Sequence, residues 1–123
     1  MDEVKTLLKK LDSEKSIIKK CAIIWELGNK GTEAEKAVSH LSKILLKGTN
    51  WRERVWTAWS LGRIGSKKAQ KTLQKIINKP YTSEEEETVV TIAEHALNYL
   101  IMGMEFDLPT SPILDEDFSK NDI

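Results

Sequence analysis

The chain has 123 residues, of which 31% are charged and 40% hydrophobic, so it has material for one domain with a modest core. No run of about 18 apolar residues occurs, and this excludes a predicted membrane-spanning helix. The N-terminus lacks the basic and then apolar segments of a secretion signal. The single cysteine, Cys21, excludes an internal disulfide. We therefore expect a cytoplasmic protein.

The formal net charge of zero conceals a division of charge along the chain. Residues 1–102 carry 18 Lys and Arg against 13 Asp and Glu, which gives 18 − 13 = +5. Residues 103–123 carry one against six, which gives 1 − 6 = −5, and two prolines interrupt any periodic pattern there. We therefore predict a basic domain over 1–102 and an acidic, flexible tail over 103–123.

Three helices are predicted in the first half of the chain. Apolar residues at helical spacing follow Asp2 as far as Leu11. Ser13 is the predicted cap of a second helix that runs to Gly28. The segment Thr32-Glu-Ala-Glu35 has the form of a capping box, so a third helix is predicted to begin there.

Three further helices are predicted in the second half. Asn50 is the predicted cap of the fourth helix, and Ser66 precedes a fifth that Pro80 closes. The acidic capping box Ser83-Glu-Glu-Glu86 opens a sixth, which runs to the end of the basic domain. No segment shows the alternation of a strand. The sequence therefore predicts an all-α fold of six helices.

The end of the second helix is repeated at the end of the fourth. Trp25-Glu-Leu-Gly-Asn-Lys-Gly31 returns as Trp59-Ser-Leu-Gly-Arg-Ile-Gly65, an offset of 59 − 25 = 34 residues. A fixed period of this length is typical of stacked helical repeats. The glycines are predicted to form tight turns between helices, because glycine adopts positive φ readily.

This unit resembles the short HEAT-like repeats of the phycobilisome-lyase type, in which a basic residue and alanines precede Leu-Gly-x-x-Gly. The resemblance covers about residues 1–102. It implies a short α-solenoid of about three helix pairs, which stack in sequence order. The matching positions are Lys19, Ala22, Leu27, Gly28 and Gly31; then Arg52 or Arg54, Leu61, Gly62 and Gly65; then a degenerate copy at Ile92, Ala93, Ala96 and Leu97, with Asn98 in place of glycine.

The family includes scaffolds, regulatory adaptors, bilin lyases and DNA glycosylases. We expect a non-catalytic protein–protein interaction module, a small adaptor or regulatory subunit. The alternative is a nucleic-acid-binding module that uses a basic concave face, and a bilin lyase or chaperone-like protein is less favoured. Cys21, His40 and His95 fall on three different predicted helices without metal-ligand spacing, so no catalytic residue, metal or cofactor is predicted.

The fourth helix carries a mixed row of basic and aromatic residues. Arg52, Trp56 and Arg63 lie at i, i+4 and i+11, with Trp59 between them. One interpretation is a ridge that anchors a protein partner, because tryptophan and arginine dominate binding hot spots. The other is that the tryptophans fill the core between repeats. Trp25, at the position equivalent to Trp59, favours the core interpretation.

Basic residues lie on one side of the second helix of each pair. In the family that this chain resembles, those helices line the concave surface, so we predict a groove for an acidic protein, or for nucleic-acid phosphates in the alternative function. The other interpretation is an ordinary solvated lysine face. The predicted binding residues are Lys36, His40 and Lys43 on the third helix and Lys68, Lys71 and Lys75 on the fifth.

The sixth helix has a broad apolar arc, and no further helix is predicted to cover it. The candidates for a cover are the tail, a second copy of the chain in a homodimer, or another protein. Our hypothesis is that the tail is a conditional element, which folds onto its own domain or binds a partner. Its predicted apolar anchors are Phe106, Leu108, Ile113, Leu114 and Phe118.

Overall fold

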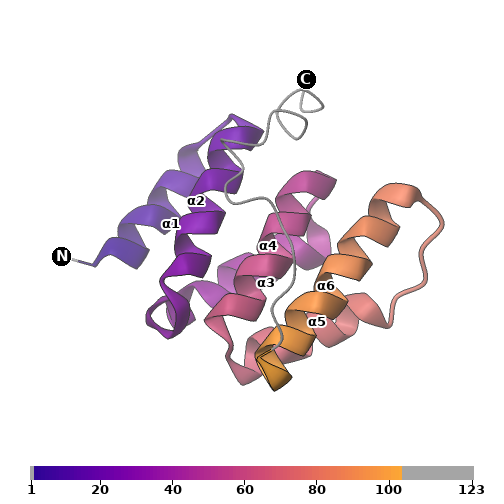
Figure 1. The fold of residues 1–123 in the computed structure, drawn as a ribbon. Coiled ribbons are helices and arrows are strands. Elements are labelled where there is room, and N and C mark those ends of the chain that lie inside the picture. The colour runs from indigo at the N-terminus through magenta and orange to yellow at the C-terminus, as the bar shows by residue number, and fades with distance from the viewer. Residues whose placement is uncertain (1, 104–123) are drawn as a thin grey trace.

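The computed structural model describes residues 2–103, and its elements are all helical within that range. The elements are α1 (Glu3–Ser13), α2 (Ile17–Asn29), the 3-10 helix η1 (Gly31–Ala37), α3 (Val38–Lys47), α4 (Trp51–Ile64), α5 (Lys67–Ile77) and α6 (Glu84–Met102) (Figure 1). The prediction of an all-α fold of six helices is confirmed.

The helices form two layers. In one layer α4 packs between α2 and α6, and in the other α3 packs beside α5 (Figure 1). The first helix, α1, packs on α2 and on η1. Successive helices alternate between the layers, so the chain winds as a short α-solenoid. Because α4 also packs on α3 and α5, it is the central helix of the molecule.

Polar side chains cap the helices at most of the predicted starts. Asp2 accepts hydrogen bonds from the backbone N–H groups of Val4 and Lys5. The Asn50 side chain caps α4 in the same way. The Ser66 and Ser83 hydroxyls accept the N–H three residues later in α5 and α6. Each cap satisfies backbone donors that have no partner inside the helix, which fixes where the helix begins.

Two predicted helix starts are wrong. The cap of α2 is Ser16, whose hydroxyl accepts the N–H of Lys19, whereas Ser13 ends α1. Between them Glu14 is extended (φ −75°, ψ 135°), so the backbone has left the helix before Ser16. The predicted box at Thr32 makes no capping hydrogen bond, because residues 31–37 form a 3-10 helix rather than a first α-helical turn.

The two glycines of the repeated unit have different roles. Gly31 and Gly65 have φ of 59° and 69°, the left-handed conformation that the turn prediction required. Gly28 and Gly62 lie inside helices and do not have positive φ. A Cβ at Gly28 would lie 2.6 Å from Ser60 Oγ. These inner glycines therefore allow neighbouring helices of one layer to approach closely, which corrects the turn prediction for them.

The same contact explains why the third copy has lost its glycine. Gly62 of α4 lies against α6, where an added Cβ would lie 2.7 Å from the Cβ of Ala96. Ala96 thus contacts Gly62 of α4 in the way that Ser60 contacts Gly28 of α2. Gly62 lies two residues after Ser60, and Asn98 lies two residues after Ala96, so Asn98 is the equivalent of Gly62 in the third copy. Asn98 is exposed, and no further helix follows within residues 2–103, so close approach is not required there.

The apolar arc of α6 is mostly used by its contacts with α4 and α5. Its buried residues are Val89, Val90, Ala93 and Ala96. The opposite side of the helix is polar and exposed, as the end of a stack of repeats requires; it carries Glu84, Glu87, Thr88, Thr91, His95 and Asn98. Less apolar surface of α6 is therefore left uncovered than the sequence suggested. The large exposed hydrophobic residues of α6 are Ile101 and Met102 in its last turn.

We predict that Gly62→Ala destabilises the fold, whereas Asn98→Ala does not. The new methyl group at position 62 would lie 2.7 Å from Ala96 Cβ and 2.8 Å from its carbonyl oxygen. Such overpacking costs about 1–3 kcal/mol, and each kcal/mol should lower the melting midpoint by roughly 4 °C. Thermal unfolding followed by circular dichroism measures both variants.

Asn98→Ala is the matched control, because it places the same methyl group at the equivalent position of an exposed helix side. Its free energy of unfolding should stay within about 0.5 kcal/mol of that of the parent chain. Equal midpoints for the two variants would show that the glycine is not a close-approach residue.

Candidate functional site

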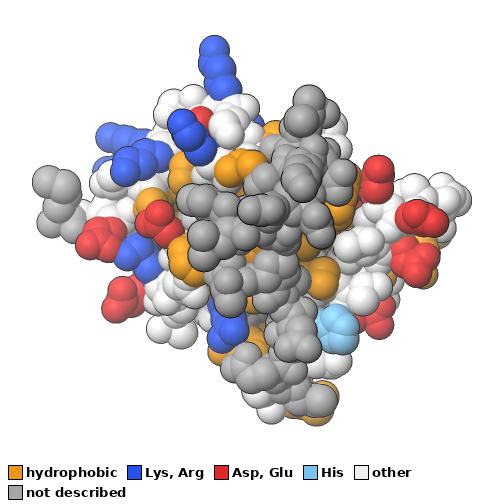
Figure 2. Space-filling view, turned by 45° about the horizontal axis from the view of Figure 1, so that its top comes forward, with side chains coloured by type: hydrophobic (Ala, Val, Ile, Leu, Met, Phe, Trp, Pro, Cys, Tyr) orange, Lys and Arg blue, Asp and Glu red, His pale blue; other side chains and the backbone are white. Residues whose placement is uncertain are grey.

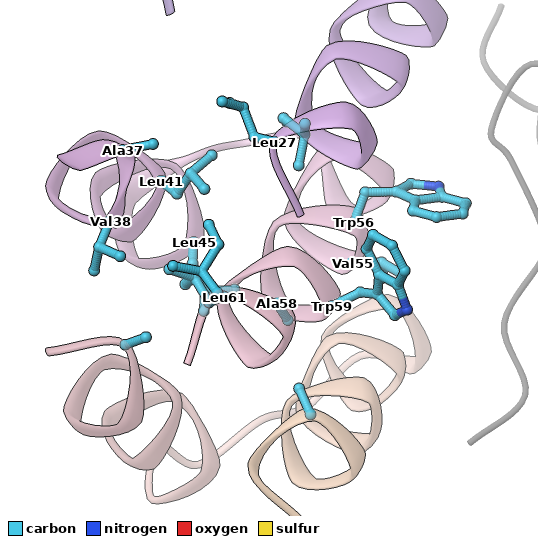
Figure 3. Packing of buried hydrophobic residues seen from close by; sticks show 14 of the residues in the cluster. Leu27, Ala37, Val38, Leu41, Leu45, Val55, Trp56, Ala58, Trp59 and Leu61 are labelled. Carbon is cyan, nitrogen blue, oxygen red and sulfur yellow. The ribbon is translucent and has the colours of Figure 1, made fainter. Parts of the chain in front are cut away.

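The side of α4 that faces away from the second layer is the first candidate surface. Ser60 points to α2, where its hydroxyl donates to the Ile24 carbonyl at 2.7 Å, and Gly62 points to α6. Leu61 points between these directions, toward α3 (Figure 3). At 100° per residue, the side opposite Leu61 carries Arg52, Trp56, Trp59 and Arg63. We call these four residues the outer face of α4.

Aromatic and cationic side chains pack on one another across this outer face. The rings of Trp56 and Trp59 meet edge to face, with centroids 5.7 Å apart and planes at 73°. The Arg63 guanidinium lies 5.2 Å from the Trp59 ring centroid and 4.5 Å from that of Tyr99. Its Nη1 also donates to the Tyr99 hydroxyl at 2.9 Å. Arg63 therefore connects α4 to α6 through contacts that are both polar and cation–π.

The outer face is buried to a degree unexpected for an exposed ridge. Trp56 is 0% exposed, Trp59 6% and Arg52 8%, and Arg63 is half-buried. Figure 3 shows both indoles directed away from α3 and α5. This burial favours the core interpretation for the tryptophans over an open ridge. Binding of a partner by Arg52, Trp56 and Arg63 stays a prediction.

The second candidate surface lies on the opposite side of the molecule. Ser42 of α3 and Thr72 of α5 share a buried hydrogen bond of 2.8 Å, and Lys68 donates to Ser39. These contacts hold α3 and α5 side by side. The lysine face comprises the exposed residues Lys43 on α3 and Lys68, Lys71 and Lys75 on α5. The structure thus brings together four of the six basic residues predicted to bind a partner.

The other two predicted basic residues are engaged by acids near the N-terminus. Lys36 donates to the Asp2 carboxylate, and His40 Nε2 lies 2.9 Å from Asp12 Oδ1. Sequence patterns could not reveal these pairs, because α1 reaches η1 and α3 only through tertiary packing. The positive charge is therefore concentrated farther from α1 than predicted. A shallow surface pocket next to His40 is lined by Lys43, Ile44, Lys47, Gly48 and Glu53.

Exposed ion pairs also shift the pKa values of the first two acids. The hydrogen bond from Lys36, helped by the Lys5 backbone N–H, lowers the pKa of the Asp2 carboxyl. The hydrogen bond from Lys30 lowers the pKa of Glu3, and the same bond raises the pKa of Lys30. These pairs tie the start of α1 to η1 and to the end of α2.

Chemistry other than binding has few candidate residues in residues 2–103. No group of three or more His, Cys, Asp or Glu side chains there could hold a metal ion. Cys21 is a buried core residue.

No helix in residues 2–103 is long and apolar enough to cross a membrane. The five predicted tail anchors, Phe106, Leu108, Ile113, Leu114 and Phe118, lie outside the described residues.

The two-layer stack and its close glycine contacts agree with the comparison with known families. The sequence model described as HEAT repeats matches residues 4–98, which is most of the chain. The chain belongs to the HEAT-repeat family. No curated protein and no solved structure matches it. HEAT repeats generally mediate protein–protein interaction, and the family is typically non-enzymatic.

We predict that the lowered pKa values of Asp2 and Glu3 depend on separate lysines. Lys36→Ala should raise the pKa of Asp2 toward its ordinary value and leave the pKa of Glu3 unchanged. Lys30→Ala should raise the pKa of Glu3 and leave that of Asp2 unchanged. Carboxyl-carbon NMR titrations measure both pKa values in each variant.

The sign of the accompanying stability change follows from the direction of the shifts. Because the folded-state pKa values lie below the unfolded ones, the stabilisation is complete above the unfolded values. It is lost as the pH falls through the folded values. If removal of one lysine changed the pKa values of both Asp2 and Glu3, the assignment of a separate lysine to each acid would be contradicted.

Proposed function

We propose that the chain is a non-catalytic protein-binding module, a small adaptor or regulatory subunit, and that the lysine face binds an acidic protein partner. The observation that carries the proposal is the placement of Lys43, Lys68, Lys71 and Lys75 as exposed residues on two adjacent helices. Membership of a family that generally mediates protein–protein interaction supports it.

The chemistry of the face favours an acidic partner bound by charge. Lysine ammonium groups are mobile point charges, which attract carboxylates without imposing the planar geometry that arginine imposes. Such a surface increases the association rate and discriminates by sign of charge more than by shape. The exposed side chains of α3 and α5 are all polar, so the lysine face offers no aromatic hot spot of its own. We therefore expect moderate affinity and a strong dependence on ionic strength.

Charge reversal on the lysine face tests the proposal. Lys43→Glu with Lys71→Glu should lower capture of the acidic partner about tenfold or more, equivalent to about 1.4 kcal/mol. Affinity capture from lysate with quantitative mass spectrometry identifies partners of the parent chain. The purified complexes are then measured by titration at two salt concentrations.

The matched control is Lys15→Glu with Lys19→Glu, which makes the same charge change at exposed positions away from α3 and α5. Equal loss in both variants would indicate an effect of net charge and contradict the assigned face. Binding of duplex or single-stranded DNA that collapses as salt rises, without any protein partner, would instead favour the nucleic-acid alternative.

A further inference from the structure

The outer face of α4 is buried although it faces away from the second layer. The described elements that pack most on α4 are α2, α6, α3, α5 and η1. α2 and α6 lie on its two flanks, and the others lie on the side of Leu61. Trp56 and Trp59 point the other way (Figure 3), yet they are 0% and 6% exposed. Complete burial of an outward-pointing tryptophan calls for a covering segment.

We propose that the outer face of α4 is a peptide-binding surface, and that its occupant is the chain's own acidic tail, residues 104–123. This inference concerns a different surface from the lysine face and does not depend on the proposed function. It assigns the apolar and acidic residues of the tail to one site on the domain.

The point at which the described chain ends supports this occupant. The Gly103 N–H donates to the Tyr99 carbonyl, and Tyr99 in turn accepts a hydrogen bond from Arg63. The tail therefore leaves the domain one helical turn beyond the residue that borders the outer face. Gly103 has φ of 70°, so the chain turns sharply at the end of α6 instead of continuing its axis.

The length of the tail is sufficient for this path. Helices in contact lie about 8–10 Å apart, so the distance from α6 across α4 to α2 is roughly 20 Å. Twenty residues of extended chain span at most about 66 Å. The tail can therefore cross the whole layer with length to spare.

The chemistry of the tail complements that of the surface. The outer face presents two indoles between Arg52 and Arg63, and the tail has a formal charge of 1 − 6 = −5. Each apolar anchor region of the tail contains acids: Glu105 and Asp107 flank Phe106, and Asp115 to Asp117 precede Phe118. Two prolines between these regions limit the freedom of the unbound segment, which reduces the entropy lost on binding.

The rest of the layer extends the apolar surface beyond α4. Hydrophobic side chains are visible at several places around the centre of this view, and acidic side chains gather at its right-hand edge, where α6 begins (Figure 2). Trp25 on α2 and Ile92 on α6 are both partly exposed and packed against the core. An acidic segment would therefore be repelled from the start of α6 and attracted to the arginines of α4.

The test removes the anchors in the full chain and measures access to the two buried indoles. Trp25→Phe and Trp51→Phe form the background, so that Trp56 and Trp59 report alone. Phe106→Ser with Phe118→Ser should then raise acrylamide quenching of tryptophan fluorescence by about twofold or more, because a protected surface opens. The matched control is Thr110→Ala with Ser119→Ala, which should leave the quenching unchanged.

Each remaining outcome supports or overturns the proposal. Unchanged quenching on loss of the anchors would overturn it, and quenching that depends on protein concentration would assign the cover to a second copy. If the anchor variant loses helical circular dichroism, a second variant replaces it, in which Asp115→Asn, Glu116→Gln and Asp117→Asn remove the negative charges. The same increase in tryptophan quenching is expected. Lys43→Glu with Lys71→Glu should not change the quenching. An increase there would show that exposure of the two indoles responds to charge elsewhere on the molecule instead of to a tail bound on the outer face, and it would overturn the proposed site.

Discussion

The close approach of α2, α4 and α6 is the contact on which the rest of the structure depends. Gly28 and Gly62 remove the side chains that would hold these helices apart, so α4 is pressed between two neighbours. Nearly every residue of α4 from Val55 to Ile64 is buried as a result. A helix in this position cannot leave polar groups without partners, because burial without hydrogen bonds is costly. Its polar residues therefore determine how the layers are joined.

Arg54 shows how such a residue connects the layers. Its Nε donates to the Leu45 carbonyl near the end of α3, and its Nη1 donates to both carboxylate oxygens of Glu86 in the first turn of α6. One side chain thus satisfies an orphan carbonyl at a helix end and fixes the start of another helix. The Thr57 hydroxyl donates a hydrogen bond to the Glu53 carbonyl within α4. Polar groups of the central helix thereby reinforce the packing that buried them.

Much of the fold could be predicted from the sequence, because its signals are local. The caps at Asp2, Asn50, Ser66 and Ser83 act within three residues, and the repeated unit gave the correct period. The error at Ser13 arose because two nearby serines could begin the helix, and the error at Thr32 arose because residues 31–37 form a 3-10 helix without a side-chain cap. The role of Gly62 was missed because only the neighbouring helix shows that its missing side chain matters.

The candidate surfaces were predicted less completely, because they depend on contacts distant in sequence. The lysines of α3 and α5 share a face that helical periodicity alone indicates. Their distance from the acids of α1 does not follow from that pattern, and neither does the engagement of Lys36 and His40 by Asp2 and Asp12. For Trp56, the repeated unit favoured a place in the core, which agrees with its burial, whereas nothing in the sequence indicated the burial of Arg52.

The two surfaces differ in what they can hold, and this difference bears on where an acidic tail would bind. Charge alone would attract residues 104–123 to the lysine face. Exposed side chains on α3 and α5 are polar, however, so that face offers less apolar surface to phenylalanine or leucine anchors. The outer face of α4 offers both arginine charge and indole surface, and burial of apolar area contributes more than screened surface charge. A tail bound there would leave the lysine face open, so the two sites could be occupied at the same time.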